Sequence, residues 1–196
     1  MHTAIELPAG RFSLLIAPDR ALEYLLDPVA SLAWRGPLLI LDGGNSFNVY
    51  QVARHIERRR PAWASHLASH PASQQAGQET GLDSILANIQ VARAFTCYQV
   101  VALLSSTPAT PAPTLVLDML ATFADETVPF GERRRLLSAC LLELHRLSRL
   151  APLGVSARLP RVEKPETSKL LASLEDAADQ VYRYELPAVP TQPRLF

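Results

Sequence analysis

Short apolar runs alternate along this chain with longer segments in which apolar residues recur at helical spacing. Residues 12–17 and 115–118 have the length and composition of buried strands. Residues 21–34 instead place apolar side chains every three or four positions, on one face of a helix. Strands that alternate with helices are typical of a parallel sheet covered by helices on both faces. We therefore expect an α/β protein with a mostly parallel central sheet flanked by helices.

The same patterns give the bounds of the predicted elements. The predicted strands are Phe12–Ala17, Pro37–Leu41, Ile89–Ala94, Leu115–Asp118, Gly154–Ala157 and Gln180–Tyr184. The predicted helices are Ala21–Trp34, Val49–Arg59, Tyr98–Leu104, Glu132–Leu150 and Ser168–Ala178. Residues 61–81 are rich in Ala, Ser, His and Gln without a clear period, which indicates a variable insert or loop. Three prolines and no apolar pattern predict an extended C-terminal tail over residues 187–196.

The composition is that of a single globular domain. Apolar residues make up 48% of the 196 residues, enough for a core that needs no metal or disulfide. The formal net charge is zero, so any contact with nucleic acid has to come from a local basic patch. The N-terminal residues lack the pattern of a signal peptide, and no apolar run reaches the length of a membrane helix. We therefore expect a cytoplasmic protein without a membrane partner.

The cysteines and histidines do not form a metal-binding pattern. Cys97 and Cys140 lie far apart inside apolar stretches, where we expect buried free thiols. His55, His66 and His70 have neither a regular helical spacing nor a fourth ligand. We expect no metal site.

Four segments follow one another in an order that is found in a known family. Residues 42–47 read Asp-Gly-Gly-Asn-Ser-Phe, and residues 92–95 read Ala-Arg-Ala-Phe. Residues 115–118, Leu-Val-Leu-Asp, precede a long helical segment and a further strand at 154–157. This series resembles the ATPase core of RecA/RadA recombinases, which has Asp-Thr-Glu-Gly-Thr-Phe, Ala-Arg-Ala-Phe and a Walker B strand ending in a magnesium-directed aspartate. The resemblance covers about residues 12–185 and implies a RecA-like three-layer sandwich as the core, over residues 1–186.

The phosphate-binding loop of that family is altered in this sequence. Such a loop needs glycines, whose N–H groups surround the phosphates, together with a lysine and a hydroxyl. Residues 17–24, Ala-Pro-Asp-Arg-Ala-Leu-Glu-Tyr, contain no glycine and no Lys-Ser/Thr pair. Pro18 also removes an N–H group, and Asp19 and Glu23 put negative charge where the phosphates would lie. At ~4 Å each such repulsion is on the order of 4 kcal/mol.

The catalytic positions depart from the family pattern as well. The glutamate that orients the attacking water aligns with Gly44, and the polar sensor aligns near residues 158–160, Arg-Leu-Pro. These changes imply an inactive recombinase relative of the ImuA or RadA type, with a degenerate Walker A loop and no catalytic residue. The vestigial nucleotide-site positions are Pro18, Asp19, Arg20, Asp42, Gly44 and Asp118. We expect no cofactor.

Two acids, Asp42 and Asp118, are left that a magnesium ion could use. A carboxylate at the carboxyl end of a strand also commonly caps the following turn or helix, and we favour that interpretation for both. Asn45 and Ser46 precede a helix predicted to begin near Phe47, and we interpret them as caps too.

Basic residues gather in two segments, 123–135 and 158–169, that the resemblance equates with the DNA-facing loops of recombinases. The candidate DNA-facing residues are Arg133, Arg134, Arg135, Arg158, Arg161 and Lys164. Five acidic residues in the same segments favour a solvated surface with salt bridges instead. DNA contact through these residues is therefore expected to be weak and sensitive to salt.

The last five residues, Gln-Pro-Arg-Leu-Phe, resemble the Gln-x-x-Leu-Phe peptide by which repair proteins bind the sliding clamp. Gln192 would form a hydrogen bond at the rim of an apolar pocket that takes Leu195 and Phe196. An extended, proline-containing segment loses little entropy on binding. The alternative is an ordinary frayed terminus.

The hypothesis that follows is a non-catalytic RecA/RadA-like accessory protein that binds other proteins in DNA repair, recombination or translesion synthesis. A sliding clamp, a recombinase or a translesion polymerase is the expected partner. Two alternatives stay open. One is an atypical NTPase that uses Asp118 or is completed by a catalytic subunit, and the other is a direct DNA-binding module.

Overall fold

One six-stranded sheet forms the centre of the computed structural model, which describes residues 5–18, 21–67, 81–159 and 164–184. The strand order is β3-β2-β4-β5-β1-β6, and every neighbouring pair is parallel. The strands are β1 (Phe12–Ala17), β2 (Leu38–Asp42), β3 (Ile89–Arg93), β4 (Thr114–Leu117), β5 (Leu153–Arg158) and β6 (Gln180–Arg183).

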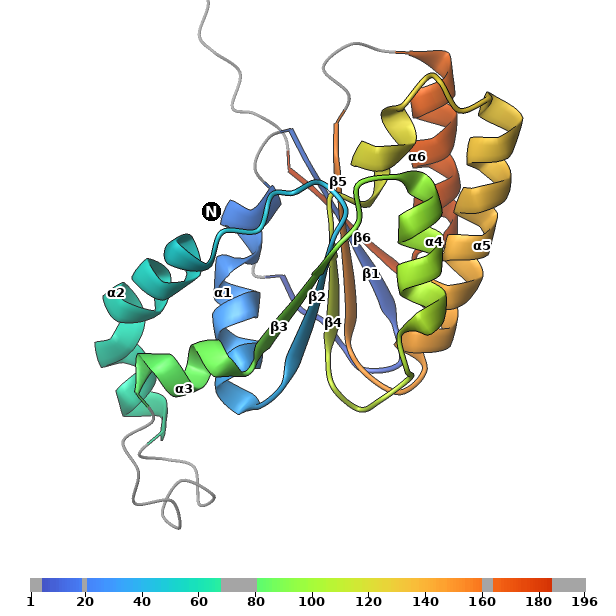
Figure 1. The fold of residues 1–196 in the computed structure, drawn as a ribbon. Helices are drawn as coiled ribbons and strands as arrows, with labels where there is room; N and C mark the ends of the chain where they lie inside the picture. The colour runs from blue at the N-terminus through green and yellow to red at the C-terminus, as the bar shows by residue number, and fades with distance from the viewer. Residues whose placement is uncertain (1–4, 19–20, 68–80, 160–163, 185–196) are drawn as a thin grey trace, which may run out of the picture.

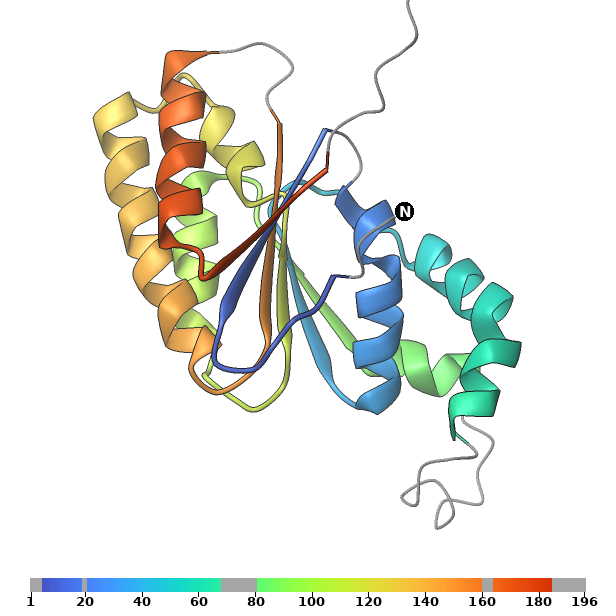
Figure 2. The same ribbon diagram turned by 180° about the vertical axis from the view of Figure 1, so that it is seen from behind.

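Helices cover both faces of this sheet, so the molecule has three layers (Figures 1 and 2). The helices on one face are α1 (Ala21–Arg35), α2 (Val49–Leu67) and α3 (Leu82–Ala87). Those on the other are α4 (Cys97–Ser106), α5 (Phe130–Ser148) and α6 (Pro165–Ala177), together with the short 3-10 helix η2 (Met119–Ala124). The predicted α/β class, with a parallel central sheet flanked by helices, is confirmed.

The sheet separates two hydrophobic clusters, because successive side chains of a strand point to opposite faces. In β1, Leu14 and Ile16 belong to the cluster under α4, α5 and α6, whereas Leu15 and Ala17 belong to the cluster under α1. Strands β1 and β4 are buried along their whole length. Burial on both faces explains why these two strands read as continuous apolar runs in the sequence.

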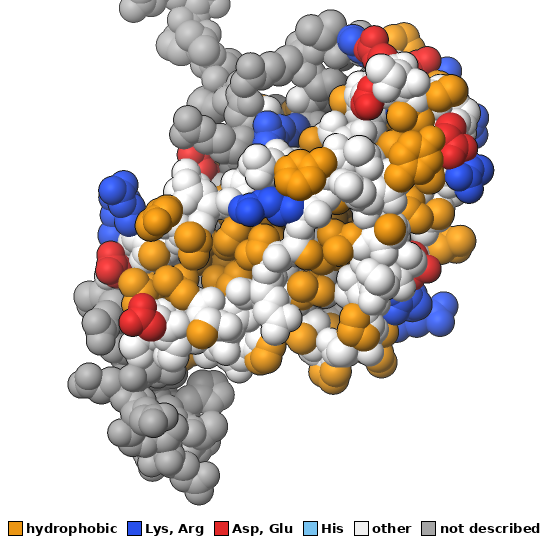
Figure 3. Space-filling view, viewed as in Figure 1, with side chains coloured by type: hydrophobic (Ala, Val, Ile, Leu, Met, Phe, Trp, Pro, Cys, Tyr) orange, Lys and Arg blue, Asp and Glu red, His pale blue; other side chains and the backbone are white. Residues whose placement is uncertain are grey.

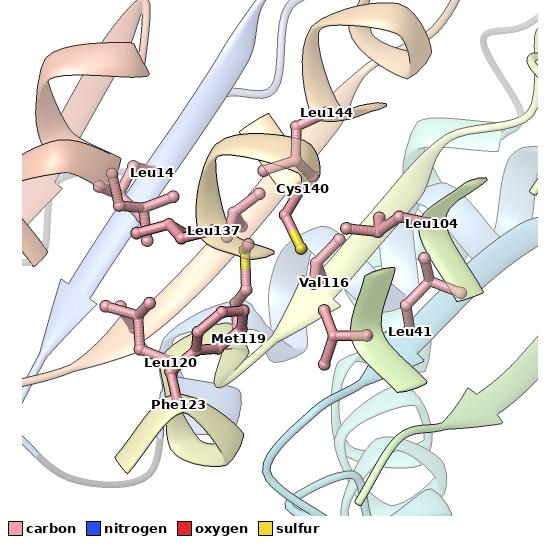
Figure 4. Close-up of a cluster of buried hydrophobic side chains, with 14 of the residues drawn as sticks. Leu14, Leu41, Leu104, Val116, Met119, Leu120, Phe123, Leu137, Cys140 and Leu144 are labelled. Carbon is pink, nitrogen blue, oxygen red and sulfur yellow. The ribbon is translucent and has the colours of Figure 1, made fainter. Parts of the chain in front are cut away.

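The segment directly after β4 is part of the hydrophobic core. Met119 and Phe123 of η2 are buried in one cluster with Leu137 and Cys140 of α5 (Figure 4). This packing fixes the backbone at the carboxyl end of β4, where Asp118 lies.

Helix bounds differ from the prediction in the region of residues 49–87. The helix predicted to end at Arg59 continues to Leu67, because alanines with high helix propensity follow Pro61. The predicted insert at 61–81 therefore begins inside α2, and its residues 68–80 lie outside the described residues. Helix α3 was not predicted because six residues with one buried side chain, Ile85, give no readable period.

Helices α5 and α6 begin earlier than predicted, at Phe130 and Pro165. Proline suits the first helical turn because its missing N–H has no intrahelical partner there.

Both cysteines are free and buried, as predicted. Burial raises the pKa of the Cys97 thiol, and it raises the pKa of Cys140 to about 12. Of the helices that the structure describes, none has the length and apolar character that crossing a membrane requires.

Candidate functional site: the carboxyl ends of the central strands

The candidate site lies at the edge of the sheet where the parallel strands end. Asp42 closes β2, Asp118 follows β4 and Arg158 closes β5, and these three strands are consecutive neighbours in the sheet. Ligands of open α/β sheets bind at this edge. Pro18 follows β1 and is half-buried, whereas Asp19 and Arg20 lie outside the described residues.

Asp42 is fully buried, and the loop that follows it surrounds its carboxylate with N–H donors. Oδ1 accepts hydrogen bonds from the N–H groups of Gly44 at 3.3 Å and Ser46 at 3.0 Å, and Oδ2 accepts one from Phe47 at 3.0 Å. The Nε of Arg93 lies 3.4 Å from Oδ2. The interpretation of Asp42 as a cap of the following turn is therefore confirmed.

Asn45 and Ser46, however, are not helix caps. Asn45 has a positive φ of 49°, which asparagine tolerates, and forms the turn itself. The Ser46 hydroxyl is directed at the carboxylate of Asp42. Helix α2 begins at Val49, and the side chain of Asn48 accepts a hydrogen bond from the N–H of Tyr50 at 2.9 Å. The helix thus begins at Val49, as its apolar pattern predicted, and not near Phe47, whose N–H is directed at Asp42.

Asp118 is 1% exposed and makes a different set of contacts from Asp42. Its Oδ2 accepts hydrogen bonds from Nε of Arg158 at 2.9 Å and from Nη2 of the same guanidinium. Its N–H donates to Oγ of Ser156 at 2.9 Å, and its φ is 47°, in the left-handed region. Oδ1 is buried and has no hydrogen-bond partner among the described residues.

The interpretation of Asp118 as a helix cap was therefore wrong. The residue does stand at the N-cap of η2, but its carboxylate caps no N–H group there. Its left-handed backbone turns the side chain towards β5, where Arg158 neutralises it.

Gly44 lies against Asp118. A β-carbon added to Gly44 would come within 2.3 Å of the Asp118 Cβ and 2.8 Å of its Oδ2. No side chain fits at this position unless Asp118 moves. The position that the resemblance equates with the catalytic glutamate thus has no room for one.

The two strand-end acids are therefore already compensated by the protein's own groups. Three N–H groups and a guanidinium hold Asp42, and a guanidinium holds Asp118. In the part of the chain that the structure describes, no group of three or more His, Cys, Asp or Glu residues could hold a metal ion. His55 is 2.8 Å from Asp27, and the side chains of His66 and His70 are not described.

The candidate DNA-facing residues are for the most part held in ion pairs. Arg135 pairs with Glu132, Lys164 pairs with Glu126, and Arg158 pairs with Asp118. Arg134 is exposed, with its guanidinium 5.9 Å from the centre of the Phe130 ring. Arg161 lies outside the described residues.

Arg133 cannot face DNA in this structure, which corrects its assignment. Its side chain is 4% exposed and donates to the carbonyls of Val128 at 3.0 Å and Phe123 at 3.1 Å, and to Glu166. It joins the segment after η2 to α6. Sequence reasoning treated the three consecutive arginines as one exposed group. On a helix, however, consecutive side chains point in different directions, so one of the three can be buried while the others are exposed.

Arg93 and Ser156 belong to the site and were missed by sequence reasoning. The sequence could have indicated Arg93, because this residue lies within the Ala-Arg-Ala-Phe segment at the end of β3. Ser156 lies inside a buried apolar strand, and its sequence surroundings give no sign of its bond to Asp118. The predicted partner-binding residues Gln192, Leu195 and Phe196 lie outside the described residues.

Comparison with solved structures finds a similar fold in the crystal structure of the RadB recombinase. The TM-score is 0.57 at 13% sequence identity, and the match covers 92% of this chain and 77% of the RadB chain. The likeness shows that this chain has a RecA-like fold, as predicted. No family model matches the sequence. A search of curated proteins also finds no match.

Proposed function

We propose that this chain is a non-catalytic RecA-like protein that acts by binding other proteins in DNA repair, recombination or translesion synthesis. Three features support the absence of catalysis: a phosphate loop without glycines, Gly44 in place of a glutamate, and the pairing of both strand-end acids. The assignment to DNA repair rests on the sequence resemblance, together with a fold similar to that of a recombinase.

The observation that carries the proposal is the ion pair between Asp118 and Arg158. Asp118 stands where the resemblance puts a magnesium-directed aspartate, and Nε of Arg158 lies 2.9 Å from its carboxylate. A divalent cation at this carboxylate would have to displace a guanidinium and would be repelled by it. A guanidinium keeps its positive charge at any physiological pH. The protein thus supplies internally the charge that a metal would otherwise bring.

Nucleotide titration tests the absence of catalysis. We expect no micromolar binding of a fluorescent ATP analogue in the presence of Mg²⁺, and no phosphate release above that of a denatured sample. Arg158→Ala should behave in the same way, because the phosphate loop is altered independently of the ion pair. Micromolar binding with turnover by the wild-type protein would instead support the atypical NTPase.

The C-terminal residues are the proposed partner-binding segment, with the sliding clamp as the first partner to test. Leu195 and Phe196 offer appreciable apolar area, worth roughly 1.5–3 kcal/mol each when buried. Calorimetry should detect micromolar binding of the wild-type protein to the organism's clamp. The double variant Leu195→Ala/Phe196→Ala should lose binding at an unchanged unfolding temperature.

A matched control for this experiment is Val189→Ala/Thr191→Ala, which alters the same tail outside the motif and should bind as the wild type does. Equal affinity of all three proteins, or no binding by any, would contradict the clamp assignment. A recombinase and a translesion polymerase are then the next partners to titrate.

A direct DNA-binding module is the second candidate function. The observation in its favour is the Phe130 ring, which has the cationic groups of Arg134 and Lys169 each 5.9 Å from its centre. An aromatic ring beside cations suits a nucleobase and its phosphate. Titration with single-stranded DNA at several salt concentrations tests it. Tight, steeply salt-dependent binding that Arg134→Ala weakens would favour this candidate.

A further inference from the structure

Two segments that are far apart in the sequence meet where η2 ends and where α5 and α6 begin. They are residues 123–135 and 164–169, which we call together the junction surface. This surface carries five basic and four acidic side chains and is therefore nearly neutral: Arg133, Arg134, Arg135, Lys164, Lys169, Asp125, Glu126, Glu132 and Glu166. Acidic and basic side chains are interspersed over this part of the molecule, at the upper right of Figure 3.

Two ion pairs join one segment of the junction surface to the other. Arg133 of α5 pairs with Glu166 in the first turn of α6, and Lys164 at the N-cap of α6 pairs with Glu126 after η2. In each pair one segment supplies the base and the other the acid, and the order is reversed between the two pairs. Each segment therefore neutralises a cation of the other.

The Phe130 ring lies among three cations of the same surface. The guanidinium of Arg133 is 5.7 Å from the ring centre, and the cationic groups of Arg134 and Lys169 are each 5.9 Å from it. Arg134 and Lys169 form no ion pair among the described residues. Cations beside an aromatic ring suit the phosphates and bases of a single strand. The junction surface thus has the groups of a polyanion site, with carboxylates placed among them.

The two inter-segment carboxylates are held ionised beside these cations. The hydrogen bond from Lys164 lowers the pKa of the Glu126 carboxyl, and the charge of Arg133 lowers it further. The side chain of Arg133 is 4% exposed, and a buried guanidinium needs an anion beside it, which Glu166 provides. A phosphate that approaches Phe130 would therefore be repelled by carboxylates as well as attracted by the cations.

We propose that Glu126 and Glu166 form an autoinhibitory contact, which occupies the cations of the junction surface and keeps it from binding single-stranded nucleic acid. The inference rests on the cationic surface of the second candidate function and adds its regulation. It leaves the C-terminal segment, by which we propose that the chain binds a partner, unaffected.

The two acids should contribute in different ways. Lys164 is 57% exposed, so the loss of Glu126 would leave its ammonium group able to reach a phosphate. Arg133 would stay buried without Glu166, but its charge would no longer be neutralised and would attract an anion to the Phe130 ring. Each additional phosphate contact on a single strand steepens the fall of log K with log salt by about 0.7.

The experiment titrates the full chain into a fluorescent oligothymidine at several salt concentrations and measures anisotropy. Glu126→Gln/Glu166→Gln should bind about tenfold more tightly than the wild type at low salt, with a steeper salt dependence. The matched control is Glu143→Gln/Glu175→Gln, which changes the net charge by the same amount. These two acids pair with Arg146 and Arg183, outside the junction surface. The control should gain less than about twofold, because its charges lie further from Phe130.

A single variant keeps the proposal testable if the loss of Glu166 leaves Arg133 uncompensated and unfolds the protein. Both members of the other pair are exposed, Glu126 at 62% and Lys164 at 57%, so Glu126→Gln should fold normally. It should gain roughly fivefold in affinity at low salt. Glu126→Gln/Lys164→Gln should return to the affinity of the wild type, because the released cation is gone.

Three results would overturn the proposal. A wild type that binds as tightly as Glu126→Gln would support the direct DNA-binding module without inhibition. An equal gain in the control would show that only the net charge of the chain matters. No gain in any folded variant would show that the junction surface binds no single strand, and the proposed binding of a protein partner would still stand on the titration of the clamp.

Discussion

Asp42 and Asp118 occupy equivalent places at the ends of neighbouring strands, but the protein compensates their charges by different means. Both carboxylates are buried, at 0% and 1% exposure, and each faces an arginine whose side chain is 44% exposed. Three N–H groups of the adjacent loop hold Asp42, with Arg93 at a longer 3.4 Å. Asp118 accepts hydrogen bonds from Arg158 alone among the described residues, and its Oδ1 is unpaired.

The difference shows that a buried acid can accept hydrogen bonds from its own loop or from a residue far away in the sequence. Removing the arginine partner should then destabilise the protein to different extents in the two cases. The N–H donors to Asp42 lie within five residues of it in the sequence, so their hydrogen bonds form whenever the loop folds. The partner of Asp118 is 40 residues away and is present only when β4 and β5 are paired. The removal of one arginine should therefore be far more damaging than the removal of the other.

The largest effect is expected for Arg158→Met, which keeps the aliphatic stem and removes the charge. Asp118 would be left as a buried carboxylate without a donor, and we expect the free energy of unfolding to fall by about 2–4 kcal/mol. Urea unfolding monitored by circular dichroism measures it.

The double variant Arg158→Met/Asp118→Asn should recover a large part of this loss, because the uncompensated charge is gone. Exposed ion pairs typically contribute roughly 0.5 kcal/mol. A fall below about 0.5 kcal/mol for Arg158→Met would therefore show that water solvates the Asp118 carboxylate as well as the guanidinium does.

The second effect in size is expected for Gly44→Ala. The new methyl group would lie 2.3 Å from the Asp118 Cβ, so either the loop or Asp118 must shift. Overpacking of this kind costs about 1–3 kcal/mol. Gly131→Ala is the matched control, because a β-carbon there would meet no atom within 4 Å. Equal unfolding midpoints for both variants would mean that the close approach of Gly44 and Asp118 does not exist in solution.

Asp42→Asn is expected to have an intermediate effect of about 1.5 kcal/mol. The amide of asparagine keeps one oxygen that can accept hydrogen bonds from the N–H groups of the loop. Its NH₂ group takes the place of the second carboxylate oxygen and faces N–H donors with which it cannot form hydrogen bonds. Unfolding in urea measures the loss, and amide hydrogen exchange at Ser46 and Phe47 should increase locally. Unchanged exchange at these two amides would contradict the hydrogen bonds to Asp42.

The fold was predictable from sequence because its central strands are buried on both faces. β1 was predicted with the bounds that the structure has, and β4 within one residue at each end, since nothing in such a strand faces solvent. α3 was not predictable, because a six-residue helix with one buried side chain has too few positions to show a period.

The site was predictable where the interactions are local and not where they are distant. A carboxylate at the carboxyl end of a strand predicts a cap, and Asp42 is one. The same argument failed for Asp118, because nothing near it in sequence indicates that Arg158 would be its partner. The burial of Arg133 was hidden for the same reason, since Glu166 is 33 residues away.

The smallest effect is expected for Arg93→Met, and this variant completes the comparison with Arg158→Met. The two arginines are equally exposed and each faces a buried aspartate, so exposure and charge alone would predict equal losses. Asp42 keeps three N–H donors without Arg93, and a half-exposed pair at 3.4 Å contributes little in high dielectric. The free energy of unfolding should therefore fall by less than about 0.5 kcal/mol.

Both arginine variants are unfolded in urea under the same conditions, so that their losses of unfolding free energy can be compared directly. If Arg93→Met proves as destabilising as Arg158→Met, the loop does not compensate Asp42. The two acids would then be equivalent, and the distinction between local and distant compensation would be wrong.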